Sequence, residues 1–188
     1  MFEDMTKGLA VQVTESSDDE WFKIEDGTKK IRVLSEGKLF QRWYDGTGYK
    51  TCVDDDGRPD DVNPQIRWMT QVLEDGKIKL ANMPWGFYSE ITNLQKDEDW
   101  GFDLMPMEYD VSFTVQNAGT TSVKYSVVPS PKKEAISEDV KADLEEASTP
   151  ADVVEAMQNK RKKELDSSGE DTPLEYPKAD INPEDVPF

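Results

Sequence analysis

The sequence predicts a mainly β domain with one intervening helix, followed by an acidic tail that is partly helical and partly disordered. Three observations predict this fold class. Short segments in which apolar and polar residues alternate, bounded by Gly, Asp or Pro, recur through the first 133 residues. One segment among them instead repeats its apolar residues at helical spacing. Aromatic residues, which build cores, become rare after Tyr125, where only Tyr176 and Phe188 remain.

Six segments have the alternation and the turn signals of strands. Two Asp-Gly pairs, at residues 26–27 and 75–76, are typical of tight turns, and the second joins the clearest hairpin of the chain. We expect Pro84 to end that hairpin, and Pro129 and Pro131 to stop the last one. The expected strands are residues 29–34, 38–44, 65–73, 77–81, 109–115 and 123–128; residues 9–13 have the alternation of a short edge strand, and residues 45–64 are expected to be loop.

Three helices are predicted. Phe87, Ile91 and Leu94 recur at helical spacing and predict an amphipathic helix of roughly three turns that closes one end of the sheet. After the last strand, Ser137 is an N-cap followed by acids, and Pro150 occupies the first position of a second tail helix with a thin apolar face. The bases at residues 160–163 suit the end of that helix, and we interpret them as a solvated helix end rather than a nucleic-acid contact.

Short strands with a helix between the fourth strand and the final hairpin favour a small closed or nearly closed β-barrel of the OB type, with a sandwich as the alternative. The tail differs from this domain in charge, since residues 134–188 hold 16 acids and 6 bases. We therefore divide the chain into an OB-like domain at residues 1–133, a helical acidic segment at 134–166 and a disordered acidic tail at 167–188. The sequence leaves open whether the helical segment packs on the domain.

The composition excludes several classes of protein. Histidine is absent and Cys52 is the one cysteine, so neither an internal disulfide nor a cysteine-rich zinc site can form. We see no nucleophile elbow, P-loop or paired carboxylates outside loops, and expect no catalytic residue, metal or cofactor. The Asp cluster between residues 54 and 61 lacks the spacing of a calcium loop, and we interpret it as a solvated loop. No apolar run has the length of a membrane span, which favours a cytoplasmic protein.

Basic residues fall on the predicted strands while acids crowd the turns, although the net charge is −18. Aromatic residues are interleaved with these bases, and a cationic sheet with exposed rings is typical of proteins that bind single strands without reading sequence. The alternative is that aromatics fill the core, which we favour for Trp21, Phe22, Trp68 and Trp100, and that strand lysines protect edges. The candidate nucleic-acid-binding residues are Lys30, Arg32, Arg42, Trp43, Tyr44, Tyr49, Arg67, Lys77 and Lys79.

The last eight residues are a second candidate site. Pro183 and Pro187 favour an extended chain, and a terminal Phe beside its free carboxylate suits an apolar pocket with basic groups. A frayed terminus without function is the alternative. The stretch resembles the acidic C-terminal tip of bacterial single-stranded DNA-binding proteins, which runs through several Asp into Ile-Pro-Phe. This resemblance implies a partner-binding tip formed by Glu184, Asp185, Val186, Pro187 and Phe188.

A further resemblance rests on the order of several segments: Trp21-Phe22-Lys23, Asp26-Gly27, residues 30–35, residues 77–80, residues 97–101 and residues 125–131. In this order they resemble a phage-encoded single-stranded DNA-binding protein of the OB-fold type, over most of residues 20–133. The resemblance implies that the barrel holds single-stranded DNA during phage replication and recombination, in the host cytoplasm. It also implies that the tip recruits replication or recombination proteins.

Other functions remain as alternatives. An acidic DNA mimic or inhibitor of a host nucleic-acid enzyme suits the net charge of −18, but not the bases on strands. A virion or scaffold component is also compatible with the sequence, which leaves the oligomeric state open. For a DNA-binding protein, an acidic tail tethered to a basic groove is expected to compete with DNA because its effective concentration is high. Removing residues 180–188, or the tail from Glu134, is then expected to tighten binding most at low salt.

Overall fold

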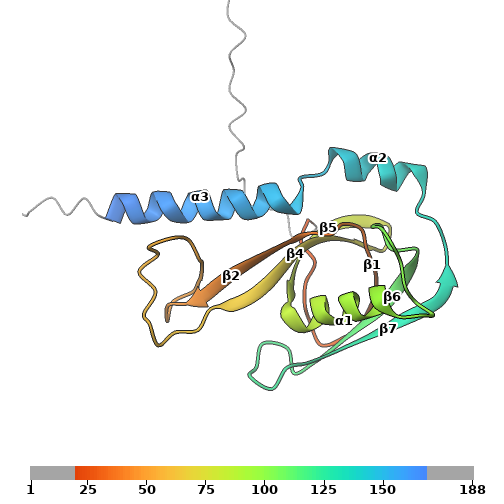
Figure 1. Cartoon of the computed structure of the whole chain (residues 1–188), viewed down its shortest axis with the longest axis horizontal. Helices are drawn as coiled ribbons and strands as arrows, with labels where there is room; N and C mark the ends of the chain where they lie inside the picture. Colours follow the sequence, from red (N-terminus) through yellow and green to blue (C-terminus); the bar gives the residue numbers. More distant parts are fainter. Residues whose placement is uncertain (1–19, 169–188) are drawn as a thin grey trace, which may run out of the picture.

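The computed structural model describes residues 20–168, so the predicted strand at residues 9–13 and the predicted tip at residues 184–188 lie outside the described residues. Seven strands and three helices make up the described part of the chain (Figure 1). The strands are β1 (Gly27–Val33), β2 (Lys38–Tyr44), β3 (Tyr49–Thr51), β4 (Gln65–Glu74), β5 (Lys77–Pro84), β6 (Tyr109–Gln116) and β7 (Lys124–Lys133). The helices are α1 (Trp85–Lys96), α2 (Glu138–Glu146) and α3 (Pro150–Ser168). The predicted mainly β fold with one helix among the strands is confirmed.

One antiparallel sheet contains all seven strands, and β4 is its centre. On one edge of β4, β2 pairs with the first half and β1 with the second, while β5 pairs along the other edge. Strands β1 and β2 therefore run end to end. β6 pairs with the outer edge of β1, β3 with that of β2, and β7 with β6. β3 lies within the predicted loop 45–64, and its three residues are too few to show an alternating pattern.

The step from β1 to β2 along β4 depends on Gly37. Its φ is 68°, and a Cβ atom there would lie 2.2 Å from the carbonyl oxygen of Met69. Around this step the indole of Trp68 donates to the carbonyl of Glu36 at 2.8 Å, and the hydroxyl of Thr70 donates to the carbonyl of Ser35 at 2.8 Å. These two side chains supply hydrogen bonds to the carbonyls of Glu36 and Ser35, which the pairing between strands leaves without a donor. The step thus requires glycine at position 37.

The last hairpin runs on through two prolines that were expected to stop it. β7 extends to Lys133, and Pro129 lies opposite Val111 of β6. The reason is position. Among residues 20–168, β7 pairs with β6 alone, and proline is tolerated on an edge strand, where its missing N–H removes no ladder hydrogen bond. The predicted end of this strand at Val128 is therefore wrong.

Helix α1 lies in the hollow of the curved sheet and supplies the centre of the core (Figure 1). The ring of Phe87 is fully buried, 6.0 Å from the ring of Trp68 and 4.9 Å from that of Phe113. α1 contacts both β5 and β7, but the described residues contain no pairing between these two strands. The sheet therefore curves without closing, and the predicted barrel closure is not found.

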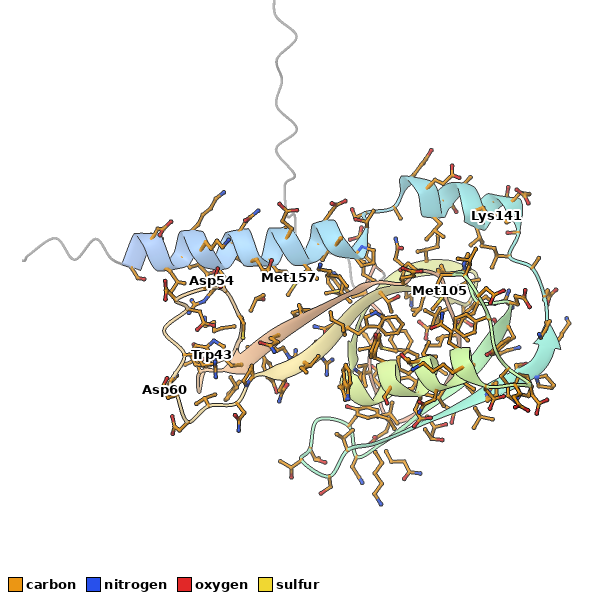
Figure 2. All side chains as sticks on the ribbon, in the orientation of Figure 1. Trp43, Asp54, Asp60, Met105, Lys141 and Met157 are labelled. Atoms are coloured by element: carbon orange, nitrogen blue, oxygen red, sulfur yellow. The ribbon has the colours of Figure 1, made fainter. Side chains whose placement is uncertain are left out.

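The acidic helical segment packs on the sheet, which answers the question that the sequence left open. Val154 of α3 is buried against Phe40 of β2 and Met69 of β4, and Met157 adds to the same cluster. Figure 2 shows Met157 on the side of α3 that faces the strands. α3 extends through residues 167–168, which were expected to be disordered. Within residues 20–168, no helix has the length and apolar character needed to cross a bilayer.

Candidate nucleic-acid interface

The nine candidate residues divide between the two ends of β4. Near the end of β4 at Glu74, the acid-paired end of the sheet carries Lys30, Arg32, Lys77 and Lys79. Near its beginning at Gln65 lie Arg42, Trp43, Tyr44, Tyr49 and Arg67. All six bases are on strands, as expected, but the two ends differ in what surrounds the charges.

At the acid-paired end, Asp110 of β6 neutralises two of the predicted bases. Arg32 is only 5% exposed, and its Nε donates to Asp110 at 2.7 Å. A second guanidinium N–H donates to the carbonyl of Glu134. Lys30 pairs with the other oxygen of the same carboxylate at 3.2 Å. Arg32 therefore joins β1, β6 and the end of β7 inside the protein, whereas the sequence predicted a side chain directed away from the core.

Glu74 neutralises a second set of bases at this end. The Glu74 side chain is 11% exposed, and its carboxylate forms ion pairs with the Nζ of Lys79 at 2.7 Å and the Nζ of Lys29 at 3.7 Å. Lys77 lies opposite Glu74 in the β4–β5 register. These lysines lie around a carboxylate that is already part of the fold. Lys79 and Lys29 thus already have a carboxylate partner in the fold.

Trp43 points into the protein rather than to the surface. Its side chain is 7% exposed, and its indole N–H donates to a carboxylate oxygen of Asp56 at 3.1 Å. The backbone N–H of Arg58 donates to the other oxygen of Asp56 at 3.0 Å, which holds the loop against the ring. Trp43 thus fixes loop 52–64 on β2, and its ring face is not available for stacking on a base.

The remaining predicted residues come together with one more side chain to form what we call the arginine–tyrosine cluster: Arg42, Tyr44, Tyr49, Arg67 and Tyr125. The Arg42 guanidinium carbon lies 3.7 Å from the centre of the Tyr49 ring, the geometry of a cation–π contact. Tyr49 also meets Tyr44 edge to face, with ring centres 5.3 Å apart. Both tyrosines are about half exposed, at 51% and 54%. The cluster therefore offers ring surface beside positive charge.

Neither arginine of the cluster takes part in an ion pair among the described residues. Arg67 donates instead to the neutral side chain of Asn82 at 2.8 Å and to its carbonyl. The Nε of Arg42 is buried and has no hydrogen-bond partner in the described part of the chain. In a chain with 40 acids and 22 bases, two neighbouring guanidiniums without a carboxylate are conspicuous.

The pKa values of these groups report the same proximity. Burial, followed by the charge of Arg42, lowers the pKa of Arg67 to about 10, while Tyr125 and Tyr49 act in the opposite direction. Burial likewise lowers the pKa of Arg42, again opposed by Tyr49 and Tyr125. Both guanidiniums remain charged at neutral pH. The repulsion between them disfavours the folded state until an anion neutralises it.

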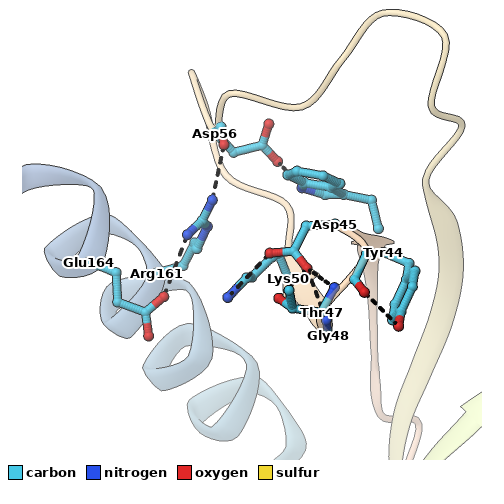
Figure 3. Close-up of polar contacts among 10 residues, drawn as sticks. Tyr44, Asp45, Thr47, Gly48, Lys50, Asp56, Arg161 and Glu164 are labelled. Atoms are coloured by element: carbon cyan, nitrogen blue, oxygen red, sulfur yellow. Dashed lines mark hydrogen bonds and ion pairs between the residues drawn. The ribbon is translucent and has the colours of Figure 1, made fainter. Parts of the chain in front are cut away.

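A tight turn places the two exposed tyrosines side by side. One carboxylate oxygen of Asp45 accepts from the N–H and hydroxyl of Thr47, at 2.8 and 2.7 Å, and from the N–H of Gly48 at 2.9 Å (Figure 3). These hydrogen bonds hold the pKa of Asp45 well below its usual range, and Lys50 adds an ion pair at 3.6 Å. The turn joins β2 to β3, so that Tyr44 lies opposite Tyr49. Asx turns of this kind are a recognisable sequence signal.

Two aromatic residues were missed as candidates: Tyr125, which belongs to the cluster, and Trp85, which lies near it. Tyr125 comes from β7, and its ring stacks on Phe113 at 5.9 Å. Trp85 follows Pro84, the register partner of Arg67, and is 48% exposed. Trp85 is not among the candidates chosen from the sequence, although it lies among the aromatics interleaved with the strand bases. For Trp85 a sequence signal was available, because an aromatic residue directly follows a proline that ends a strand. For Tyr125 there was none, because nothing in the sequence indicates that it lies near Arg42.

Among the residues that the structure describes, no group of acids and cysteine is arranged to hold a metal ion. Comparison of the chain with protein-family models, with curated proteins and with solved structures found no match. The functional conclusion therefore rests on the geometry of the site.

Proposed function

We propose that this protein binds single-stranded DNA without sequence specificity, through the arginine–tyrosine cluster. The observation that carries the proposal is the pair Arg42 and Arg67, two neighbouring guanidiniums that lack a carboxylate among the described residues and lie beside exposed tyrosine rings. Guanidiniums bind phosphate in a bidentate manner, and bases stack on aromatic rings for roughly 1–3 kcal/mol each. A single strand supplies both groups at once, because its phosphates and bases are exposed together.

The resemblance extends this proposal to a place in the cell. We place the protein in the host cytoplasm, where it protects single-stranded DNA during phage replication and recombination. The tip at Glu184, Asp185, Val186, Pro187 and Phe188 recruits replication or recombination proteins. The alternative, an acidic DNA mimic, draws support from the net charge of −18. A mimic has no use for a cationic cluster flanked by rings, and for that reason we favour the DNA-binding function.

The test is fluorescence anisotropy of a labelled oligo(dT) titrated with the full-length protein at several salt concentrations, with tryptophan fluorescence read in parallel. We expect the logarithm of the affinity to fall with the logarithm of salt on a slope of about −2 to −4, corresponding to ~3–5 phosphate contacts. Absence of binding even at low salt would reject the proposal, and the acidic mimic would become the leading function.

A matched pair of double variants locates the site. Arg42→Gln with Arg67→Gln removes two charges from the cluster, and we expect affinity to fall at least about tenfold because charge-assisted hydrogen bonds to phosphate are lost. Lys30→Gln with Lys38→Gln removes the same charge from exposed strand positions outside the cluster and is expected to change affinity less than about threefold. Equal losses in the two double variants would place the binding surface elsewhere on the sheet.

A further inference from the structure

A groove continues from the cluster to helix α3. It has a volume of about 330 Å³ and is lined by Tyr49, Lys50 and Thr51 on the β3 side and by Met157, Lys160, Arg161 and Glu164 on the α3 side. This volume is at the lower end of the ~300–1,000 Å³ typical of small-ligand sites. Tyr49 belongs to both places, since its ring stacks on Arg42 and also lines the groove. The groove and the cluster are therefore contiguous.

The α3 wall of this groove is fixed to the sheet. Val154 is 2% exposed, where it packs on Phe40 and Met69. Further along the helix, Arg161 donates to the carbonyl of Asp56 at 3.1 Å and pairs with Glu164 at 3.5 Å, as Figure 3 shows. Anchors near the start and along the second half of α3 hold the helix alongside β3. The basic side chains of α3 consequently have defined positions relative to the cluster.

Lys160 is the cation that this wall presents to the groove. It is exposed, and it takes part in none of the ion pairs found among residues 20–168. The other two bases of the groove are occupied, since Lys50 pairs with Asp45 at 3.6 Å and Arg161 pairs with Glu164. Lys160 therefore has its charge available for an incoming anion in a groove that Tyr49 shares with the cluster.

We propose that a single strand bound to the arginine–tyrosine cluster continues over Tyr49 into this groove and places a phosphate on Lys160 of α3. This inference rests on the proposed function and adds a second part to the binding surface. We interpreted residues 160–163 from the sequence as a solvated helix end. Under this proposal one of them, Lys160, contacts a phosphate of the DNA. The helical acidic segment then belongs to the DNA-binding unit, although its composition is that of a tail.

The neighbouring lysines of α3 do not share this role. Lys162 lines a different hollow, together with Asp54 and Asp56, whose carboxylates repel phosphate. The groove at Lys160 has one carboxylate, that of Glu164, and it is paired with Arg161. Lys163 is exposed and lines neither hollow. The proposal is thus specific to one lysine of a basic run, which makes the other lysines internal controls.

The test compares Lys160→Glu with Lys163→Glu in the full-length protein, using oligo(dT) of about 4 and about 16 nucleotides, lengths that span the site sizes of single-strand binders. Both variants change the net charge equally and lie on the same helix. We expect Lys160→Glu to weaken binding of the longer oligonucleotide about fivefold or more and to reduce its salt slope by about 0.7, the value of one phosphate contact on a single strand. The shorter oligonucleotide and the Lys163→Glu variant are expected to change less than about twofold.

Three results would overturn the inference, and they differ from one another. Equal weakening by the two variants would show a long-range charge effect without a contact. No change for Lys160→Glu, with a clear loss for Arg42→Gln and Arg67→Gln, would confine DNA to the cluster and leave the proposed function intact. No binding of either oligonucleotide by the unsubstituted protein would remove the proposed function and this inference together.

Discussion

Two arginines of the same sheet have opposite surroundings. Arg32 of β1 is buried with a carboxylate at 2.7 Å, whereas Arg42 of β2 lies on a tyrosine ring and has no carboxylate among the described residues. Both strands pair with the same edge of β4, one after the other. The two arginines therefore differ in whether the fold supplies a counter-charge, which their positions on strands do not reveal. We expect only the arginine without a carboxylate partner to bind phosphate.

The comparison also separates stability from function. At the acid-paired end Arg32 is buried on the carboxylate of Asp110, and losing that partner leaves the guanidinium buried alone, which is costly. At the cluster the guanidiniums of Arg42 and Arg67 repel each other, so their charges do not stabilise the folded state. We therefore expect substitutions at the acid-paired end to lower stability without changing DNA binding, and substitutions at the cluster to do the reverse.

The largest effect on stability is expected from Asp110→Asn. The substitution leaves Arg32 buried without a carboxylate, and we expect the free energy of unfolding to fall by about 2 kcal/mol. DNA affinity is expected to stay within about twofold. Urea unfolding and oligo(dT) titration measure the two quantities, with Asp60→Asn in an exposed loop as the control of equal charge. A loss of DNA binding by a folded Asp110→Asn protein would contradict the division between the two ends.

The next largest effect on stability concerns Tyr109, which precedes Asp110 in the chain. The hydroxyl of Tyr109 donates a hydrogen bond to the carbonyl of Trp100. Burial and the nearby Asp97 and Glu108 raise the pKa of Tyr109 from its ordinary value of 10 to about 12. The folded protein thus holds this proton more tightly than the unfolded chain. The resulting stabilisation is complete below pH 10 and is lost as the pH rises to 12.

We therefore expect Tyr109→Phe to lower the free energy of unfolding by about 1 kcal/mol at neutral pH. Between pH 10 and 12 the stability of the unsubstituted protein is expected to fall more steeply than that of the variant. Urea unfolding at a series of alkaline pH values measures both slopes. Parallel slopes would show that the Tyr109 proton is not bound more tightly in the folded state.

A substitution at Gln65 is expected to convert the cluster into an acid-paired site. Gln65 lies opposite Arg42 in the β2–β4 register, so Gln65→Glu supplies the missing carboxylate. We expect oligo(dT) affinity to fall about fivefold, or about 1 kcal/mol, because the new carboxylate competes with phosphate. Stability is expected to rise by a few tenths of a kcal/mol. The control is Gln95→Glu on the exposed side of α1, and equal losses of affinity in both variants would show an effect of net charge alone.

The smallest effect is expected from the acidic tail. Residues 169–188 hold six acids and one base, and removing them takes away a tethered competitor for the cluster. We expect oligo(dT) binding to tighten about threefold at low salt and to be unchanged at high salt. The same truncation in the Arg42→Gln and Arg67→Gln background is expected to have no effect. Tightening that persists in that background would place the competition outside the cluster.

Much of the fold was predictable because its signals are local. The Asp75-Gly76 pair does join a hairpin, with both residues at positive φ, and the spacing of Phe87 and Ile91 marks the buried face of α1. The packing of α3 was not predictable, because three or four apolar residues on a polar helix bury only if a sheet offers partners such as Phe40 and Met69. The same holds for β7, whose prolines are tolerated because no strand of the described part of the chain pairs with its outer edge.

The candidate site was predictable in its residue types but not in its arrangement. Arg42, Tyr44, Tyr49 and Arg67 were all chosen from the sequence, since bases and aromatics on neighbouring strands are a local pattern. The partners that set Arg32 apart are Asp110 and the carbonyl of Glu134, which lie 78 and 102 residues away in the chain. Such pairings arise from topology alone, so no window of the sequence shows them.

The prolines of β7 have a consequence for crowding. Copies of a protein that coats a long strand meet at very high local density, and a bare edge strand is a template on which neighbouring sheets join. Pro129 and Pro131 lie on the outermost strand, and each removes one N–H that a second sheet would need. On the proposed function, we expect copies bound side by side on one strand to separate again, because the N–H groups missing at Pro129 and Pro131 would be needed for their sheets to pair.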